Sequence, residues 1–247
     1  MFNKKSFLVL LVFFVLAVQL LFGQSKGMMI YLSDGSIKKL AISQIDRINF
    51  NACVDIDSNI YPTVKIGDQW WMAENLKVTR YRNGDDIPIV TDDTEWENLT
   101  TGAYCNYNNN SDNADIYGRL YNWYAVNDSR NIAPLGWHVP SDGEWQTLIV
   151  YLGGESVAGG KLKETGTTHW NSSNEGATNE SGFTALPGGY RSINGYFYYL
   201  GYNAYFWSSA EYSSNGAWSR KLLCSTADVG RDLYDKRGGF SVRLVRD

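Results

Sequence analysis

The chain has few cysteines, few histidines and no excess of positive charge. Three cysteines in 247 residues are too few for a disulfide-dense scaffold or a four-cysteine zinc site. Two histidines leave little material for a histidine-rich metal centre. A formal net charge of −4 lacks the basic footprint of a nucleic-acid-binding protein. With 44% hydrophobic and 15% aromatic residues, the chain nevertheless has ample material for a folded core.

The N-terminal residues have the pattern of an export signal. Two lysines precede an unbroken apolar run of 12 residues, 7–18, and the small residue Gly23 is followed by a polar segment. This order predicts a cleaved signal peptide over residues 1–23. The alternative, a membrane anchor, needs about 20 apolar residues, and Gln19 interrupts this run. We therefore expect an exported protein, secreted or held at the cell surface or in the periplasm, without a membrane span after cleavage.

Cysteine is also missing where a lipid anchor would be attached, since the first cysteine is Cys53. We therefore expect no lipid anchor. Because the signal contains two lysines and no acids, the mature chain has 20 basic and 26 acidic residues, a net charge of −6. Such an acidic chain is a poor match for nucleic acid or an anionic membrane surface, so neither is predicted as a partner.

Residues 24–53 are predicted to form a short β leader in front of the main domain. Two apolar stretches, 28–32 and 37–42, flank an Asp-Gly pair, which is a strong signal for a β-hairpin. A further short strand is predicted within 43–50. Because an isolated hairpin is only marginally stable, the leader is expected to dock on the main domain or on a partner.

Residues 54–247 are predicted to form one α+β domain, because aromatic strands broken by glycine, asparagine and aspartate alternate with a few helices. Gly67 and Asp68 separate two short strands of a hairpin. Ser141 and the glutamate three residues later form a capping box, and apolar residues follow at helical spacing up to Leu152. Two more helices are predicted over 117–126 and 157–164.

Eight sequence blocks in this domain carry a resemblance to a known family. They are 55–61 (DIDSNIY), 64–76 (VKIGDQWWMAENL), 117–127 (YGRLYNWYAVN), 136–148 (GWHVPSDGEWQTL), 159–170 (GGKLKETGTTHW), 182–191 (GFTALPGGYR), 206–212 (FWSSAEY) and 238–247 (GGFSVRLVRD). Together they resemble the Fibrobacter succinogenes major paralogous domain family of exported bacterial proteins. The resemblance implies export, and it implies no defined biochemical role.

At greater distance, residues 136–145 are similar to the G-x-R-L-P-x-x-x-E-W signature of the formylglycine-generating-enzyme-like group. This similarity implies a C-type-lectin-like fold, with an irregular two-sheet core, two or three short helices and a face built from loops. Family members commonly carry two cysteines where this chain has Ala133 and Leu244, which implies that apolar contact replaces a disulfide. Three cysteines remain, and an odd count leaves at least one thiol free or intermolecular. Which pair bonds, if any, is left open.

The most unusual segment is 190–212, which holds 10 aromatic residues in 23. Aromatic faces beside hydroxyl and amide groups suit sugar rings. The alternative is core packing, which is favoured for Phe197, Phe206 and Trp207 because they lie in an inner-strand pattern. Trp170 is considered as a platform in a polar loop, with loop anchoring as its alternative. The candidate ligand-binding residues are Trp170, Tyr196, Tyr198, Tyr199, Tyr202 and Tyr205.

Neither a metal nor a cofactor is predicted. The Asp-x-Asp-x-Asn sequence at 55–59 resembles the start of a calcium loop, but Ile60 and Ile66 stand where an EF-hand needs glycine and glutamate. A hairpin turn is the favoured interpretation. Acidic turns at 85–86, 92–93 and 112–115 contain the oxygen ligands that calcium takes, with solvated turns as the favoured alternative.

No convincing catalytic group emerges from the pattern. His138 is interpreted as a hydrogen-bonded structural residue, and His169 has no evident partner. Cys224 lies where the formylglycine-generating enzymes place a reactive cysteine pair, but no second cysteine is nearby. The chain is therefore predicted not to be an enzyme.

Three functions are weighed. The favoured one is a non-catalytic exported module that binds a glycan or a cell-surface ligand through its aromatic loops. The second is an accessory or structural subunit of a surface assembly, which requires an unpaired strand edge in the leader. The third is an enzyme, which requires a cleft with a titratable group of shifted pKa. The oligomeric state is not predicted.

Overall fold

The computed structural model describes residues 27–31, 37–41 and 52–247 of the chain. The chain divides into two compact units, residues 1–50 and 51–247. In the first unit, β1 (Gly27–Tyr31) pairs antiparallel with β2 (Ile37–Ala41), as the Asp-Gly hairpin signal predicts. The predicted signal peptide and the strand predicted within 43–50 lie outside the described residues.

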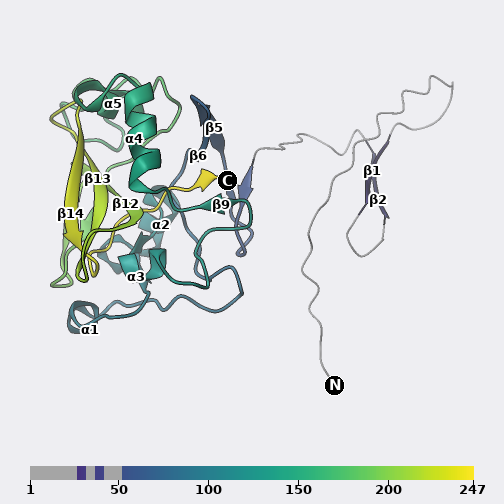
Figure 1. Cartoon of the computed structure of the whole chain (residues 1–247), viewed down its shortest axis with the longest axis horizontal. Coiled ribbons are helices and arrows are strands. Elements are labelled where there is room, and N and C mark those ends of the chain that lie inside the picture. The colour runs from purple at the N-terminus through teal and green to yellow at the C-terminus, as the bar shows by residue number, and fades with distance from the viewer. Residues whose placement is uncertain (1–26, 32–36, 42–51) are drawn as a thin grey trace. The chain divides into compact units, whose positions relative to one another are not determined.

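The largest sheet of the second unit has five strands in the order β11 (Phe197–Leu200), β10 (Gly188–Arg191), β12 (Asn203–Glu211), β13 (Gly216–Leu223) and β14 (Val229–Asp235). Strands β12, β13 and β14 form an antiparallel meander (Figure 1). Strand β10 joins β12 in parallel where Gly189 faces Ala204, and β11 folds back on β10. Period-two alternation gives this sheet two faces, and an apolar cluster packs against each of them.

In the second sheet, the C-terminal strand pairs with a strand near the N-terminal end of the same unit. Its order is β5 (Thr63–Ile66), β6 (Gln69–Met72), β15 (Val245–Arg246) and β9 (Trp137–His138). The predicted hairpin at Gly67 is confirmed, with a φ of 60° at that glycine. Two further pairs complete the strands, β3 (Cys53–Val54) with β4 (Ile60–Tyr61) and β7 (Tyr104–Cys105) with β8 (Leu120–Tyr121).

Helix α4 (Asp142–Tyr151) begins at the predicted capping box, in which Ser141 and Glu144 exchange hydrogen bonds. Helix α5 (Glu155–Leu162) follows it and starts two residues before the predicted segment. The remaining helices are α1 (Asp93–Glu97), η2 (Tyr107–Asn109), α2 (Ser111–Tyr117) and α3 (Trp123–Val126). The α+β class is confirmed, with more short helices than the two or three expected. No helix in the described part of the chain has the length and apolar character needed to cross a membrane.

The predicted helix over 117–126 is wrong. Helix α2 ends at Gly118, whose φ is +75° and whose backbone lies so close to Asn75 that an added Cβ would sit 2.6 Å from the Asn75 Cβ. The chain then forms the short strand β8, and Asn122 starts α3 by accepting a hydrogen bond from the backbone N–H of Ala125. A contact distant in sequence therefore divides a segment whose local pattern favours one helix.

Two apolar clusters lie on either side of the large sheet. On one face, Phe206 packs against Trp145 of α4 at 5.7 Å between ring centroids, and Trp145 lies 4.8 Å from Trp71 of the second sheet. On the other face, Trp207 stacks on Phe240 at 4.4 Å. Phe206 and Trp207 are fully covered, as predicted, and each contributes about 2–3 kcal/mol of burial free energy.

The positions of the absent cysteines lie in the second of these clusters. Ala133 and Leu244 are both 0% exposed and belong to the same apolar core. The three cysteines of the chain are free and buried. Packing rather than a disulfide therefore holds the last strand in this domain.

Candidate functional site

A row of side chains crosses the large sheet on the face away from α4 and α5. Tyr198 of β11 lies opposite Tyr190 of β10. Tyr205 of β12 lies opposite Lys221 of β13, which in turn lies opposite Gly230 of β14. Because directly opposed residues in an antiparallel pair share a face, these five positions line one side of the sheet.

Tyr190 lies at the centre of a group of aromatic side chains on this face. Its ring centroid lies 5.7 Å from that of Tyr198, 6.1 Å from Tyr199, 4.8 Å from Tyr205 and 5.6 Å from Tyr234. We call these five residues the tyrosine cluster. The side chains of Tyr198 and Tyr199 are exposed, with residue exposures of 39% and 53%, and the other three are half-buried beneath and beside them. Exposed rings that rest on fixed rings form a surface with few free rotamers, which lowers the entropy cost of binding.

The backbone under the cluster is held in an unusual conformation. Tyr199 has a φ of +63°, a left-handed conformation that is costly for a bulky residue. Its ring stacks on Tyr190 with an interplanar angle of 17°. At Gly189 a Cβ would meet the Tyr198 carbonyl oxygen at 2.4 Å, so only glycine lets β11 pack this closely on β10. The fold thus maintains strain at the position that presents the most exposed ring of the cluster.

The half-buried phenol groups of the cluster, those of Tyr190, Tyr205 and Tyr234, stay protonated at neutral pH. Burial raises the pKa of Tyr205 to about 12, and burial raises the pKa of Tyr190 and Tyr234 above the usual range. The Tyr205 hydroxyl accepts a hydrogen bond from Asn203 Nδ2 at 2.9 Å. The buried members therefore support an uncharged surface of rings and hydroxyl groups.

The predicted site residues fall into three groups. Tyr198, Tyr199 and Tyr205 come together in the cluster. Tyr196 and Tyr202 are exposed by 56% and 50%, in the turns on either side of β11. The prediction that Trp170 is a platform for a ligand is wrong. Its ring is completely covered, and its Nε1 donates a hydrogen bond to the Ala185 carbonyl at 2.9 Å. Its role is the alternative one, an anchor for its loop.

Two members of the tyrosine cluster were not among the site residues predicted from the sequence. Tyr190 lies in the aromatic segment but was not selected, and Tyr234 lies outside that segment altogether. The signal that would have found them is the pairing of β10 with β12 and of β13 with β14. That pairing depends on strand register, which the local pattern does not specify.

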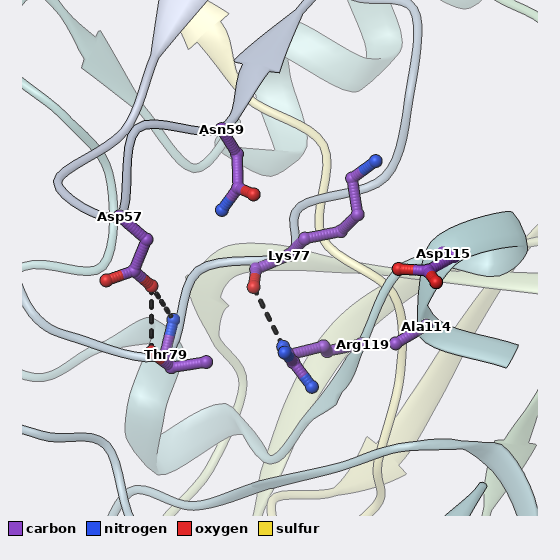
Figure 2. A pocket seen from close by; sticks show the side chains of 7 residues that line it. All are labelled: Asp57, Asn59, Lys77, Thr79, Ala114, Asp115 and Arg119. Atoms are coloured by element: carbon purple, nitrogen blue, oxygen red, sulfur yellow. Dashed lines mark hydrogen bonds between the residues drawn. The ribbon is translucent and has the colours of Figure 1, made fainter. Parts of the chain in front are cut away.

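The domain also has a small polar pocket of about 180 Å³, remote in sequence from the aromatic segment (Figure 2). It is lined by Asp57, Asn59, Lys77, Thr79, Ala114, Asp115 and Arg119. Burial raises the pKa of Asp57, but hydrogen bonds from Thr79 and Arg80 outweigh this and hold it below the usual value. Arg80 Nε lies 2.6 Å from Asp57 Oδ1. Asp57 is thus a paired carboxylate that joins two loops.

The Asp-x-Asp-x-Asn sequence beside this pocket is the predicted hairpin turn. It joins β3 to β4, and Asp55 accepts hydrogen bonds from the backbone N–H groups of Asp57 and Asn59 at 2.9 Å. The Tyr61 hydroxyl donates to the same carboxylate at 2.6 Å. Both oxygens of the Asp55 carboxylate therefore accept hydrogen bonds from within the protein. Within residues 52–247 no cluster of histidine, cysteine, aspartate and glutamate is arranged to hold a metal ion.

The two histidines are both paired with carboxylates. The ring of His138 lies between Asp247 and Glu144, at 2.6 Å from Nδ1 and 2.7 Å from Nε2, which confirms its structural interpretation. His169 was expected to have no partner, and this is wrong, because its Nδ1 lies 2.8 Å from a Glu164 carboxylate oxygen. A residue five positions away in an irregular loop gives no periodic signal that would have revealed it.

Two of the cysteine thiols, those of Cys53 and Cys105, are held in the protonated form, which is not nucleophilic. Burial raises the pKa of both Cys53 and Cys105 to about 12. A reactive cysteine has a lowered pKa and an exposed sulfur, so these two thiols have the opposite character.

Fold and surface together define an α+β domain of many short strands, with apolar clusters packed on both faces of its main sheet and a partly exposed tyrosine cluster on the face away from α4. A family model described as the Fibrobacter succinogenes major domain matches residues 64–246. The chain belongs to this family. No curated protein and no solved structure matches the chain.

Proposed function

We propose that this protein is an exported, non-catalytic binding module that recognises a glycan through the tyrosine cluster. The single observation that supports the proposal most strongly is the exposed Tyr199 ring, held at a costly φ and stacked on Tyr190. Strained, exposed aromatic residues on rigid elements are characteristic of binding sites. A C-type-lectin-like arrangement of the two sheets is part of the same proposal.

The chemistry of the surface favours a sugar over other ligands. Pyranose rings offer C–H faces that stack on aromatic rings and hydroxyl groups that bond to phenols, amides and carboxylates. The cluster supplies a stacked ring pair and several hydroxyl groups, with the amide of Asn203 beside them. Nothing in this surface resembles a nucleophile with an adjacent base, which supports a binding role rather than catalysis.

The test is a glycan-binding screen of residues 24–247, followed by titration of each ligand found. The Tyr199→Ala variant should weaken binding about fivefold, because an aromatic contact contributes about 1 kcal/mol. Tyr151→Ala is the matched control, since Tyr151 lies on α4 and is 64% exposed outside the cluster. Equal binding by both variants, with the fold intact by circular dichroism, would refute the proposal.

A second candidate is supported by the leader. Strands β1 and β2 pair with each other, and among the described residues neither has a second partner strand. Each therefore offers a free edge on which a partner protein can add a strand. If the protein is instead a subunit of a surface assembly, replacing Ile30 with proline should abolish capture of that partner and leave glycan binding unchanged.

A further inference from the structure

Beyond the tyrosine cluster, the same face of the sheet carries a polar group. Lys221 lies directly opposite Tyr205, and its Nζ forms an ion pair with Asp232 Oδ2 at 2.7 Å. Gly230, opposite Lys221, leaves room for this side chain, since a Cβ there would lie 3.4 Å from Lys221 Cε. The lysine stem thus lies across β14 and carries the ammonium to the carboxylate.

This ion pair is open to solvent on the same side as the rings. The side chain of Asp232 is 43% exposed and that of Lys221 is 28% exposed. Carboxylates and ammonium groups of this kind accept from and donate to the neighbouring hydroxyl groups of a sugar. Along the alternating positions of β10–β14 that form this face, the charged side chains are Lys221, Asp232 and Glu211. Each is ion-paired, Lys221 with Asp232 and Glu211 with Lys236, so their charges cancel. The surface therefore favours an uncharged ligand.

The strand positions that carry the polar group and the exposed rings are separated by more than the width of one sugar ring. Tyr198, Tyr190, Tyr205 and Lys221 occupy neighbouring strands, so three strand spacings separate the first from the last. At about 4.8 Å per spacing this distance is about 14 Å. A ligand that uses the whole row must consist of several linked rings.

We propose that this face binds a neutral oligosaccharide of at least three equatorially linked pyranose units, laid across the strands from Tyr198 to the Lys221–Asp232 pair. Equatorial linkages keep the C–H faces of successive rings flat against the aromatic surface. One unit lies over the exposed tyrosines, the next over Tyr190 and Tyr205, and hydroxyl groups of the last contact Asp232. This inference rests on the proposed glycan function and specifies its ligand class.

The experiment is calorimetric titration of residues 24–247 with glucose, cellobiose, cellotriose and cellotetraose. Affinity should rise at least tenfold between cellobiose and cellotetraose. Asp232→Asn should remove most of that gain and leave cellobiose binding within about twofold, because the disaccharide is held by the rings. Asp228→Asn is the matched control, an exposed carboxylate just before β14 that lies outside the row. Circular dichroism establishes that each variant is folded.

The outcomes separate this inference from the broader proposal. Equal affinity for all chain lengths, or a gain that Asp232→Asn leaves intact, overturns the extended site while glycan binding stands. Preference for an anionic polymer such as polygalacturonate overturns the neutral ligand. If no cello-oligosaccharide binds but another glycan binds in a Tyr199-dependent way, only this inference is overturned. Absence of binding to every glycan overturns both.

Discussion

Lys163 is one of the fully buried cations of the domain, and its removal gives a sharp test of the packing. The residue follows α5 and is 0% exposed. Its ammonium donates to the carbonyl oxygens of Glu175, Leu223 and Thr226 at 2.8–2.9 Å. A single side chain therefore joins the loop at Glu175 to the last residue of β13 and to the middle of the turn between β13 and β14.

We predict that Lys163→Met lowers the free energy of unfolding by about 3 kcal/mol. Each carbonyl that loses its donor in a buried site costs about 1 kcal/mol or more, and there are three. Relief of the buried charge offsets part of this cost, while the similar volume of methionine keeps a cavity from adding to it. For a domain stable by about 5–15 kcal/mol, such a loss is readily measured by urea denaturation.

The matched control lies two residues earlier on α5. Lys161 pairs with Glu180 at 2.8 Å, and both side chains are partly exposed. Lys161→Met should therefore change stability by less than about 1 kcal/mol. If Lys163→Met unfolds at the same urea concentration as Lys161→Met, the three hydrogen bonds do not stabilise the domain and the reasoning is refuted.

The same residue gives a pH signature. Burial lowers the pKa of Lys163 to about 8, whereas an unfolded lysine titrates near 10.4. Between these values the unfolded chain binds a proton that the native chain has released, so this group makes the domain more stable as pH rises from 8 to 10. The difference between wild type and Lys163→Met should grow over that interval, and a constant difference would contradict a lowered pKa.

Two further predictions concern the C-terminal strand and the end of α2. Burial lowers the pKa of His138, but hydrogen bonds to Asp247 and Glu144 outweigh this and raise it above 6.5. Its contribution is therefore complete below about pH 6.5 and lost as pH rises through the native pKa, so the destabilisation by His138→Gln should be larger at pH 6 than at pH 8.5 in urea denaturation. Gly118→Ala should destabilise by more than about 1 kcal/mol, because its φ is +75° and the new Cβ would lie 2.6 Å from the Asn75 Cβ; an unchanged melting temperature would contradict this.

Features that depend on neighbours in sequence were predictable, and those that depend on distant contacts were not. The capping box at Ser141 and the hairpin at Gly67 are local, and both were predicted correctly. The segment 117–126 has a helical pattern, yet the close approach of Gly118 to Asn75 divides it. Trp170 stands in a polar loop, and only the folded chain shows that the Ala185 carbonyl accepts from its indole. Likewise, register brings Tyr234 to Tyr190.

The aromatic segment performs two roles because β12 separates them by alternation. Phe206 points to the core beneath α4, and Tyr205, one residue earlier, points to the opposite face and the tyrosine cluster. A shift of one residue in the pairing of β12 with β13 would exchange these side chains, burying phenols and exposing phenylalanine. The core therefore fixes the register, and the register in turn fixes which rings are presented. For this reason, Phe206→Ala should cost about 3–5 kcal/mol of stability, while Tyr199→Ala should act on binding with little effect on unfolding.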